Sequence, residues 1–499
     1  MLGGRYRMVS NRVRHWTCLA LFVLVAAYTG AGDAHRHTPK DDDDSLFAGR
    51  ITVRQTVTTE GYVPQYQQLG LNGLIEAGPF SLVGEMRVQN DDRYSPPQDG
   101  HWYGFNATIH QGGAILETGP FRVRAGKLYH TGQVDSPYSL FVSSKPLGAL
   151  QLDLSVETQR LFFTTRSIVL NRDSAHGYPD RGAAIRSWGV RIRNLRVGFQ
   201  DSIVYTNRIF DLEYFINPVP GGLIQYINRA RGAPWAMGVN HNALMGFFAD
   251  YTLPRTYGYG QVLVDDFNSN RFVDPDSPYQ NPDKIAWSLG ARHGFSFGHL
   301  GLYHAGATKY TFQSFGSPGL DTRYSYTYYP DVEYRLHGQV RVIRPEENYI
   351  GYLHGENNLA FLLSYDPPAG WLSPVTLTSS LEFTLSGSKS PGNPWHEYTW
   401  FEQDGPGTRF LDDERLESKI VGRIAASVPV GGWTISADLE LGYVRNELKL
   451  TSIPDEYFVE RINEIRYFSP GTVARPIGSL RIGASYAFGY GRRNARTDW

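Results

Sequence analysis

The stretch LRIGASYAFGY at residues 480–490, near the end of the chain, decides the fold class. Apolar residues occupy every second position: Leu480, Ile482, Ala484, Tyr486, Phe488 and Tyr490. Small or polar residues fill the alternate positions, with Arg481 and Ser485 among them. Because successive side chains of a β-strand point to opposite faces, the pattern predicts a strand with one apolar face and one polar face.

The same alternation recurs upstream. Residues 433–444 (WTISADLELGYV) and residues 190–198 (VRIRNLRVG) each place apolar side chains opposite charged ones. No segment beyond the N-terminal region approaches 18 consecutive apolar residues, and no convincing helical period appears. A soluble β-sandwich would also show this alternation, so the connections between strands must distinguish the two architectures.

The connections alternate in length. Short turns are predicted at residues 77–80, 118–121, 194, 298–300 and 430–432. Long polar connections are predicted at residues 89–101, 171–183, 207–239, 268–284, 386–418 and 445–477. This alternation is typical of transmembrane β-barrels, whose long loops are extracellular, and lipid requires the sheet to close. At roughly 25 residues per strand and connection, we predict an all-β, antiparallel transmembrane barrel of about 18 strands, within a range of 16 to 20.

Composition and motifs exclude other classes of protein. The 499 residues include 32 tyrosines and 53 glycines, and the mean hydropathy of −0.36 argues against a bundle of membrane-spanning helices. A net charge of −1 offers no basic footprint for nucleic acid. The sequence contains no Walker loop, HExxH or zinc-type spacing, and its histidines are scattered. We therefore expect no enzyme activity, no metal and no cofactor, and we set aside a barrel phospholipase or protease.

The N-terminus has the layout of a secretory signal peptide. Arginines within the first 14 residues precede an apolar run at residues 17–27, and small residues follow it. A membrane anchor would need roughly 20 apolar residues, so the short run favours a cleaved signal at residues 1–31. Cleavage would remove Cys18, the only cysteine. Residues 32–48 are then expected to form a polar lead-in.

The remaining boundaries follow from the last strand. We expect the barrel to occupy residues 49–491 and a polar tail to occupy residues 492–499. The last strand resembles the terminal targeting strand of outer-membrane barrels, which implies the barrel-assembly machinery as a partner. The expected location is the outer membrane of a Gram-negative-type bacterium, with membrane lipid and lipopolysaccharide around the barrel.

Three stretches carry a family resemblance. Residues 203–218 read IVYTNRIFDLEYFINP, residues 239–248 read VNHNALMGFF and residues 257–267 read YGYGQVLVDDF. In this order they resemble the Wzi-type capsule-assembly family of outer-membrane barrels, and residues 349–363 resemble a Gly-rich strand of that family. The resemblance implies an 18-stranded, non-enzymatic barrel that binds or anchors capsular or other surface polysaccharide.

The connection 207–239 is the expected site region. It follows a strand that leaves a short turn, and it is rich in aromatic residues and proline, so we expect it to cap the extracellular mouth of the barrel. Aromatic rings there would cover sugar faces while polar groups bind hydroxyls. The glycan-binding candidates are Arg208, Asp211, Tyr214, Asn217, Trp235, Asn240, Asn242, Gln261 and Asp265. The alternation in residues 258–266 predicts that Gln261 and Asp265 point into the lumen.

An open barrel would have a different function. If the connection 207–239 does not close the mouth, the same polar lumen would serve a diffusion porin for small solutes or sugars. Charged lumen walls occur in porins whether or not they bind a ligand, so residue types alone do not separate these two functions.

Overall fold

The computed structural model describes residues 45–94, 104–143, 148–174, 177–228, 230, 232–235, 241–266, 282–313, 324–336, 338–368, 370–391, 408–454 and 464–491. The expected signal peptide with Cys18 and the expected tail 492–499 lie outside this part of the chain. Across the described residues, no helix combines the length and the apolar character that a membrane crossing requires.

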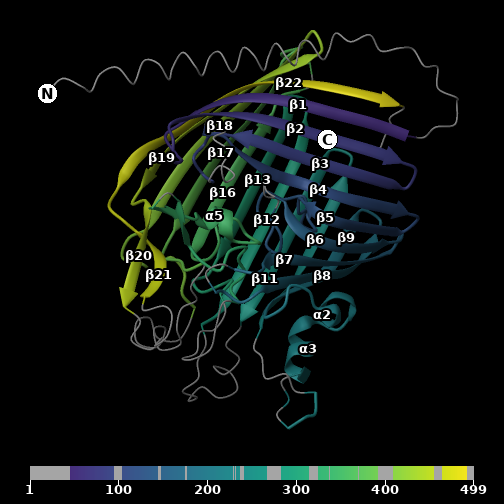
Figure 1. The fold of residues 1–499 in the computed structure, drawn as a ribbon, viewed down its shortest axis with the longest axis vertical. Coiled ribbons are helices and arrows are strands. Elements are labelled where there is room, and N and C mark those ends of the chain that lie inside the picture. Colours follow the sequence, from purple (N-terminus) through teal and green to yellow (C-terminus); the bar gives the residue numbers. More distant parts are fainter. Residues whose placement is uncertain are drawn as a thin grey trace. The chain divides into compact units, whose positions relative to one another are not determined.

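Eighteen long strands form one sheet (Figure 1). They are β1 (Ser45–Thr58), β2 (Gln65–Ala77), β3 (Phe80–Gln89), β4 (Asn106–Thr118), β5 (Phe121–Leu128), β6 (Ala149–Glu157), β7 (Leu161–Asn171), β8 (Arg181–Ile192), β9 (Leu195–Thr206), β10 (Asn242–Leu253), β11 (Thr256–Asp266), β12 (Lys284–Phe295), β13 (Gly298–Ala307), β16 (Asn358–Asp366), β17 (Thr376–Ser386), β18 (Glu417–Val430), β19 (Trp433–Arg445) and β22 (Ala474–Gly491). The first strand begins at Ser45, slightly before the expected start of the barrel at residue 49.

The sheet closes on itself. Each long strand pairs antiparallel with its predecessor along the chain, and β22 pairs with β1 so that Tyr486 stands opposite Ile51. Closure leaves the wall without a free sheet edge, as lipid requires. The prediction of an all-β, antiparallel barrel of about 18 strands is confirmed.

The two faces of the wall differ as the alternation predicts. On β19 the side chains of Leu439, Leu441 and Tyr443 are exposed on the outside, whereas Asp438 and Glu440 point into the lumen. Aromatic residues such as Trp433 directly follow short turns, where outer-membrane barrels carry an aromatic girdle. The architecture is that of a bacterial outer-membrane barrel.

One end of the barrel carries the short turns. Gly78 and Gly119 take φ angles of 56° and 54° there, in the left-handed region that glycine enters without steric cost. One predicted turn was misplaced: the connection between β12 and β13 is residues 296–297, and Gly298 already begins β13.

The opposite end, called here the long-loop end, carries two long connections that the sequence analysis missed. They are residues 129–148 between β5 and β6, and residues 308–357 between β13 and β16. The predicted strand-like stretch 349–363 is therefore divided, because β16 begins only at Asn358. Apolar residues in both connections imitate strand segments, although they pack inside the barrel.

Shorter elements lie in the long connections. Helices α2 (Leu212–Ile216) and α3 (Gly221–Asn228) follow β9. The hairpin β14 (Glu333–Leu336) and β15 (Gln339–Val342) and the short helix α5 (Pro345–Asn348) precede β16. A second hairpin, β20 (Leu448–Pro454) and β21 (Glu464–Pro470), precedes β22.

Candidate functional site

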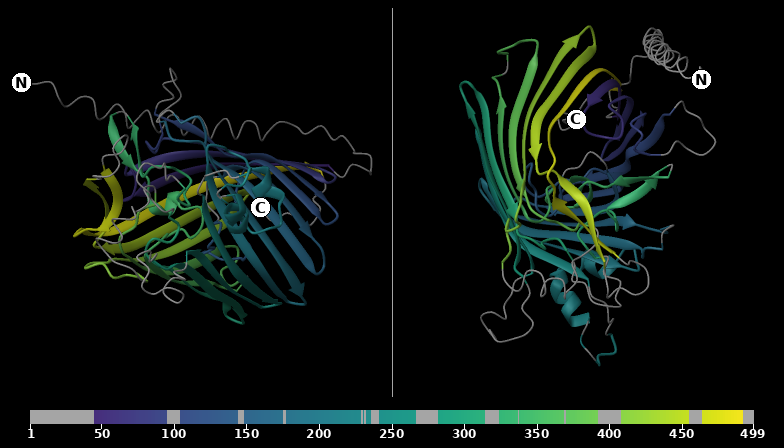
Figure 2. Two further views of the ribbon diagram at one scale, coloured as in Figure 1. Left: turned by 90° about the horizontal axis from the view of Figure 1, so that it is seen from below. Right: turned by 90° about the vertical axis from the view of Figure 1, so that its left-hand side faces the viewer.

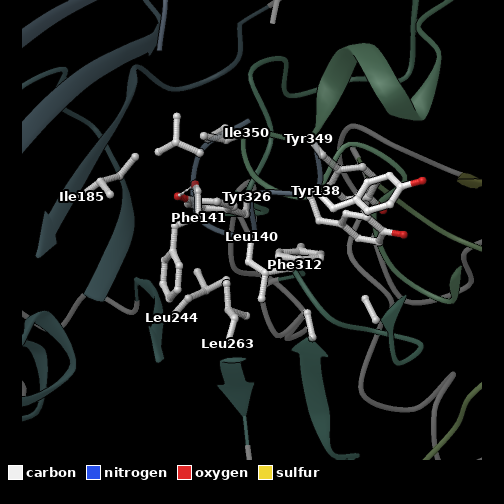
Figure 3. Close-up of a cluster of buried hydrophobic side chains, with 14 of the residues drawn as sticks. Tyr138, Leu140, Phe141, Ile185, Leu244, Leu263, Phe312, Tyr326, Tyr349 and Ile350 are labelled. Atoms are coloured by element: carbon white, nitrogen blue, oxygen red, sulfur yellow. Dashed lines mark hydrogen bonds between the residues drawn. The ribbon is translucent and has the colours of Figure 1, made fainter. Parts of the chain in front are cut away.

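The described parts of the connections 129–148 and 308–357 fold into the barrel and are called here the inner plug. Their apolar side chains form the main buried cluster of the protein with inward residues of the wall (Figure 3). The plug contributes Tyr138, Leu140, Phe141, Val142, Phe312, Tyr326, Tyr349, Ile350 and Tyr352. Small wall residues, among them Ala183, Ala286 and Ala305, leave room for these rings.

Backbone hydrogen bonds join the two connections of the plug. The Ser143 amide donates to the Ile350 carbonyl at 2.9 Å, and the Tyr352 amide donates to the Leu140 carbonyl at 3.2 Å. A Cβ atom at Gly351 would lie 1.9 Å from the Leu140 carbonyl oxygen. Only glycine fits there, because any side chain would push the two connections apart.

Two predicted site residues hold the plug to the wall. Gln261 and Asp265 point into the lumen from β11, as expected. The Gln261 Oε1 atom accepts a hydrogen bond from the Leu140 amide at 3.1 Å, and Asp265 accepts one from the Phe312 amide at 2.8 Å. Their oxygen atoms therefore bind the protein's own backbone.

A carboxylate lies at the centre of the plug. Glu356 is fully buried and accepts hydrogen bonds from the backbone amides of Tyr310 and Ser390 and from the side chain of Gln313. Burial nevertheless dominates and raises the pKa of Glu356 to about 7. The ionisation state of this group therefore changes near neutral pH.

The connection 207–241 lies on the opposite face of the wall from the inner plug. Residues 208–228, called here the outer cover, lie on the outside of the wall formed by β7 to β10 (Figures 1 and 2). The cover packs on Ile203 of β9 and Ala243 of β10, which pair with each other. Both point to the same side of the wall as the exposed Met245, two residues further along β10, so the cover lies on the outer face. The expectation that this connection caps the barrel mouth is wrong for the described residues.

Four predicted site residues build the outer cover. Asp211 caps α2 by accepting a hydrogen bond from the Tyr214 amide at 3.0 Å, and it pairs with Arg208 at 2.6 Å. The Tyr214 ring is buried on Tyr205, and its hydroxyl contacts His241 Nδ1 at 2.9 Å. The fourth, Asn217, ends α2 and donates its backbone amide to the Glu213 carbonyl. These contacts are structural, and they fix the helix against the wall.

A buried ion pair holds the outer cover in place. Arg186 on β8 and Asp201 on β9 form two hydrogen bonds, of 3.1 and 2.7 Å, and both side chains are almost fully buried. The pair also reaches the cover, because Arg186 donates to the Asn217 carbonyl and Asp201 accepts from the Gly221 amide. Charge-assisted bonds of this kind are stronger than neutral ones.

The remaining predicted residues are scattered. Asn242 is buried on the lumen side of β10, and its amide nitrogen has no hydrogen-bond partner among the described residues. Trp235 is 61% exposed, and Asn240 lies outside the described residues. The wall thus separates Gln261, Asp265 and Asn242 from the cover residues, so the predicted set does not form one site.

The sequence contains a signal that part of the outer wall is covered by protein. Arg186 and Asp201 occupy outward positions in strands that otherwise carry Trp188 and Phe199 towards lipid. A charged residue on the lipid face of a barrel is costly, so such a pair implies that protein covers it.

Charged side chains line the part of the lumen that the described residues of the plug do not fill. A cavity of about 660 Å³ lies at the long-loop end between β1, β18, β19, β22 and the plug. Its charged lining includes Glu60, Arg93, Arg344, Glu346, Glu347, Lys419, Glu440 and Arg481. Burial would raise the pKa of Glu346, but the nearby cations, Lys419 first among them, lower it. Glu346 therefore stays ionised in the cavity wall.

A second cavity lies deeper in the barrel. It has a volume of about 220 Å³ and is lined by Arg54, Thr378, Ser436, Asp438 and Arg481 among others. Arg481 lines both cavities. It contacts Asp438 at 3.4 Å, and both side chains remain partly exposed. The sequence analysis did not select these residues, because alternating charge is common to all barrel lumens.

Comparisons with known proteins yield similar folds. No protein-family model and no curated protein matches the chain. One similar solved structure is Wzi of Escherichia coli, described as an outer membrane protein involved in group 1 capsule assembly and as a carbohydrate-binding β-barrel. It is 11% identical, covers 89% of this chain and 85% of its own, and has a TM-score of 0.48. Pseudomonas aeruginosa OccK5 (OpdH) is 9% identical, with coverages of 90% and 99% and a TM-score of 0.45. Acinetobacter baumannii OccAB4 is 8% identical, with coverages of 91% and 100% and a TM-score of 0.41. These similarities concern the fold and assign no function.

Proposed function

We propose that the protein is a narrow outer-membrane channel for small polar solutes, and that solutes pass along the charged half of the lumen. The observation that carries the proposal is that Arg481 lines both lumen cavities. The inner plug fills the other half with buried apolar side chains, which offer no path for a polar solute. The channel needs no chemistry on the solute, so the function is non-enzymatic.

The charges of the deeper cavity set the preference of the channel. Arg54 and Arg481 stand on the adjacent strands β1 and β22, and both line the deeper cavity. Asp438 lines it as well and faces Arg481. The two cations outnumber the one carboxylate, so we expect a modest preference for anions. In a pore this narrow, such rings of charge control selectivity.

Single-channel recording in planar bilayers tests the channel. Ala425 lines the deeper cavity, whereas the neighbouring Ile424 faces outwards and is half exposed. Ala425→Trp should therefore reduce conductance strongly, and Ile424→Trp should leave it near that of the unmodified protein. A second variant, Arg481→Gln, should lower the anion-to-cation permeability ratio. Equal conductance in the two tryptophan variants would contradict the proposed path.

The second candidate function is the one that the family resemblance implies, the binding or anchoring of surface polysaccharide. It is favoured by Tyr62 and Tyr66, which line the larger cavity at the end that faces outwards in such barrels. A tyrosine ring can cover a sugar while its hydroxyl stays wet. Tyr66→Ala should then reduce polysaccharide retention on cells without reducing conductance, whereas a pure channel would show no change in retention.

A further inference from the structure

The outer cover has a second apolar face, on the side away from the wall. Its exposed apolar side chains are Phe210, Leu212, Ile216, Val219, Leu223, Tyr226 and Ile227. Leu223 is 56% exposed and Tyr226 is 80% exposed. Contiguous exposed apolar patches on proteins mark contact with a partner or a membrane.

The position of the cover along the barrel axis, compared with the lipid-facing band of the wall, indicates what surrounds the cover. On β19, outward apolar residues continue from Trp433, beside the short turn, to Tyr443. Ten residues of a strand tilted by about 40° rise about 25 Å, the height of the apolar band of such barrels. The equivalent stretch of β9 runs from Leu195 to Tyr205.

Only part of the outward face of β9 between Leu195 and Tyr205 is free of the cover. Leu195, Val197 and Phe199 are at least partly exposed, which accounts for about 10 Å by the same rise per residue. Asp201, Ile203 and Tyr205 are buried beneath the cover. The cover therefore stands at a level where β19 presents its own side chains to lipid.

We propose that the outer cover is a lipid-contacting element whose outer apolar face lies against the acyl chains of the outer leaflet. Its exposed side chains take the place of the lipid-facing residues that β8 and β9 lack at this level. The segment that the sequence analysis assigned to the mouth of the barrel is thus part of its membrane surface.

The cover continues the lipid-facing surface of the wall without a break. Gly222 of α3 lies beside Met245 and Ala243 of β10. Met245 is itself exposed, and the next outward residue, Phe247, is 60% exposed. Lipid surrounds these wall residues in any barrel of this kind, and the same lipid therefore reaches α3.

The polar residues under the cover require such shielding. Arg186 and Asp201 would face lipid if the cover were absent, and Thr165 and Ser167 stand beside them on β7. Thr165 donates a hydrogen bond to the Phe215 carbonyl, so the cover satisfies this group as well. Towards the wall the cover offers backbone hydrogen-bonding groups as well as the buried side chains of Tyr214 and Ile224. Towards its surroundings it is apolar, as a helix pair inserted between protein and lipid must be.

Fluorescence quenching in bilayers tests the proposal. The full chain has a single cysteine, Cys18, so single labels can be placed in a Cys18→Ser background. The test variants Leu223→Cys and Ile227→Cys carry an environment-sensitive fluorophore in phosphatidylcholine vesicles with brominated acyl chains. Leu302→Cys, on the outward face of β13, is the lipid control, and Glu414→Cys, exposed between β17 and β18, is the water control.

The expected result is quenching at positions 223 and 227 comparable to that at position 302 and several times that at position 414. Quenching no greater than at position 414 would overturn the proposal, because the cover would then face water. Weak quenching together with oxidative cross-linking between copies of the unlabelled Leu223→Cys variant would also overturn it, because a second copy would then be the occupant. Heat-modifiable migration of each labelled protein verifies that the barrel has folded.

Discussion

The inner plug, built from two connections, and the outer cover, part of a third, lie on opposite faces of the same wall. Both are rich in aromatic residues, and both follow strands that leave the short-turn end. The plug is held by interlocked apolar rings and by backbone hydrogen bonds such as that from Ser143 to Ile350. The cover packs on the wall through Tyr214, and the buried ion pair of Arg186 with Asp201 binds its backbone.

The difference shows what determines the side to which a connection folds. On the lumen side, alanines such as Ala183 and Ala305 make space for large rings without adding charge. On the outer side, a charged pair within the lipid-facing band has to be covered by backbone that can bond to it. The position of the plug is thus explained by the space that small wall residues leave in the lumen. The position of the cover is explained by the free-energy cost of a charge that faces lipid.

The largest expected effect comes from breaking the ion pair. Asp201→Ala leaves Arg186 buried without its carboxylate, which should cost about 3–5 kcal/mol of unfolding free energy. The outer cover should then detach, whereas the plug and the conductance should stay unchanged. Urea unfolding in lipid vesicles measures the free energy, and hydrogen exchange of residues 208–228 measures detachment.

Two variants sharpen that result. Replacing both partners, Arg186→Leu with Asp201→Leu, should recover most of the stability, because no uncompensated charge remains. Glu117→Ala, which breaks a pair with Arg122 that is about half exposed, should cost at most about 1 kcal/mol. If Asp201→Ala costs no more than Glu117→Ala, the ion pair does not hold the cover.

A second prediction concerns a part of the wall that has no cover. Leu480 pairs in register with Leu439, midway along the outward face of β19 and β22. Leu480→Arg should therefore cost about 2–4 kcal/mol, whereas an arginine near the membrane interface costs about 0–1 kcal/mol. Tyr486→Arg tests the interface, because Tyr486 stands opposite Trp433 beside the short turn.

The lumen face supplies the control for this prediction. Ser479 lines the charged cavity, so Ser479→Arg should change the conductance and leave the stability nearly unchanged. Equal losses of stability for Leu480→Arg and Ser479→Arg would mean that the two faces of the wall have been exchanged.

The smallest expected effect is a pH dependence confined to the plug. Burial raises the pKa of Glu356 from 4.5 to about 7, so the folded plug binds a proton that the opened plug releases. Plug stability is therefore complete below about pH 4.5, falls as the pH rises to about 7 and then stays level. At about 1.4 kcal/mol per pKa unit, the loss is at most about 3.5 kcal/mol.

Hydrogen exchange of residues 338–357 between pH 5 and pH 8, corrected for the intrinsic rate, measures this loss. Glu356→Gln should remove the pH dependence. His354→Gln serves as the matched control, since His354 belongs to the same connection and contacts Glu382 at 2.9 Å. A pH dependence that survives in Glu356→Gln and vanishes in His354→Gln would assign the effect to the histidine.

Much of the barrel was predictable, because a strand in a barrel wall leaves a local signal. The alternation in 433–444 and 480–490 identified β19 and β22, and Gln261 and Asp265 were correctly assigned to the lumen. The candidate site was predictable only as single residues. Tyr214 and Asp211 proved to be packing and capping residues on the far side of the wall from Gln261.

The plug was not predicted, because its contacts join residues that are far apart along the chain. Residues 138–142 and 349–353 are apolar enough to read as strand, although each finds its partners in the other connection, far away along the chain. A sequence contains no local record of that pairing.

The sequence by itself determined the wall: the period of two, the alternation of short and long connections, and hence a closed barrel of about 18 strands. Each of these depends on the direction of neighbouring side chains, which residue spacing specifies. The side of the wall on which each long connection lies follows only from the folded barrel, and so does the part of the lumen that the described residues of the plug fill. That choice depends on contacts between distant residues, such as Asp201 with Gly221 and Leu140 with Gly351, which become close only once the barrel has formed.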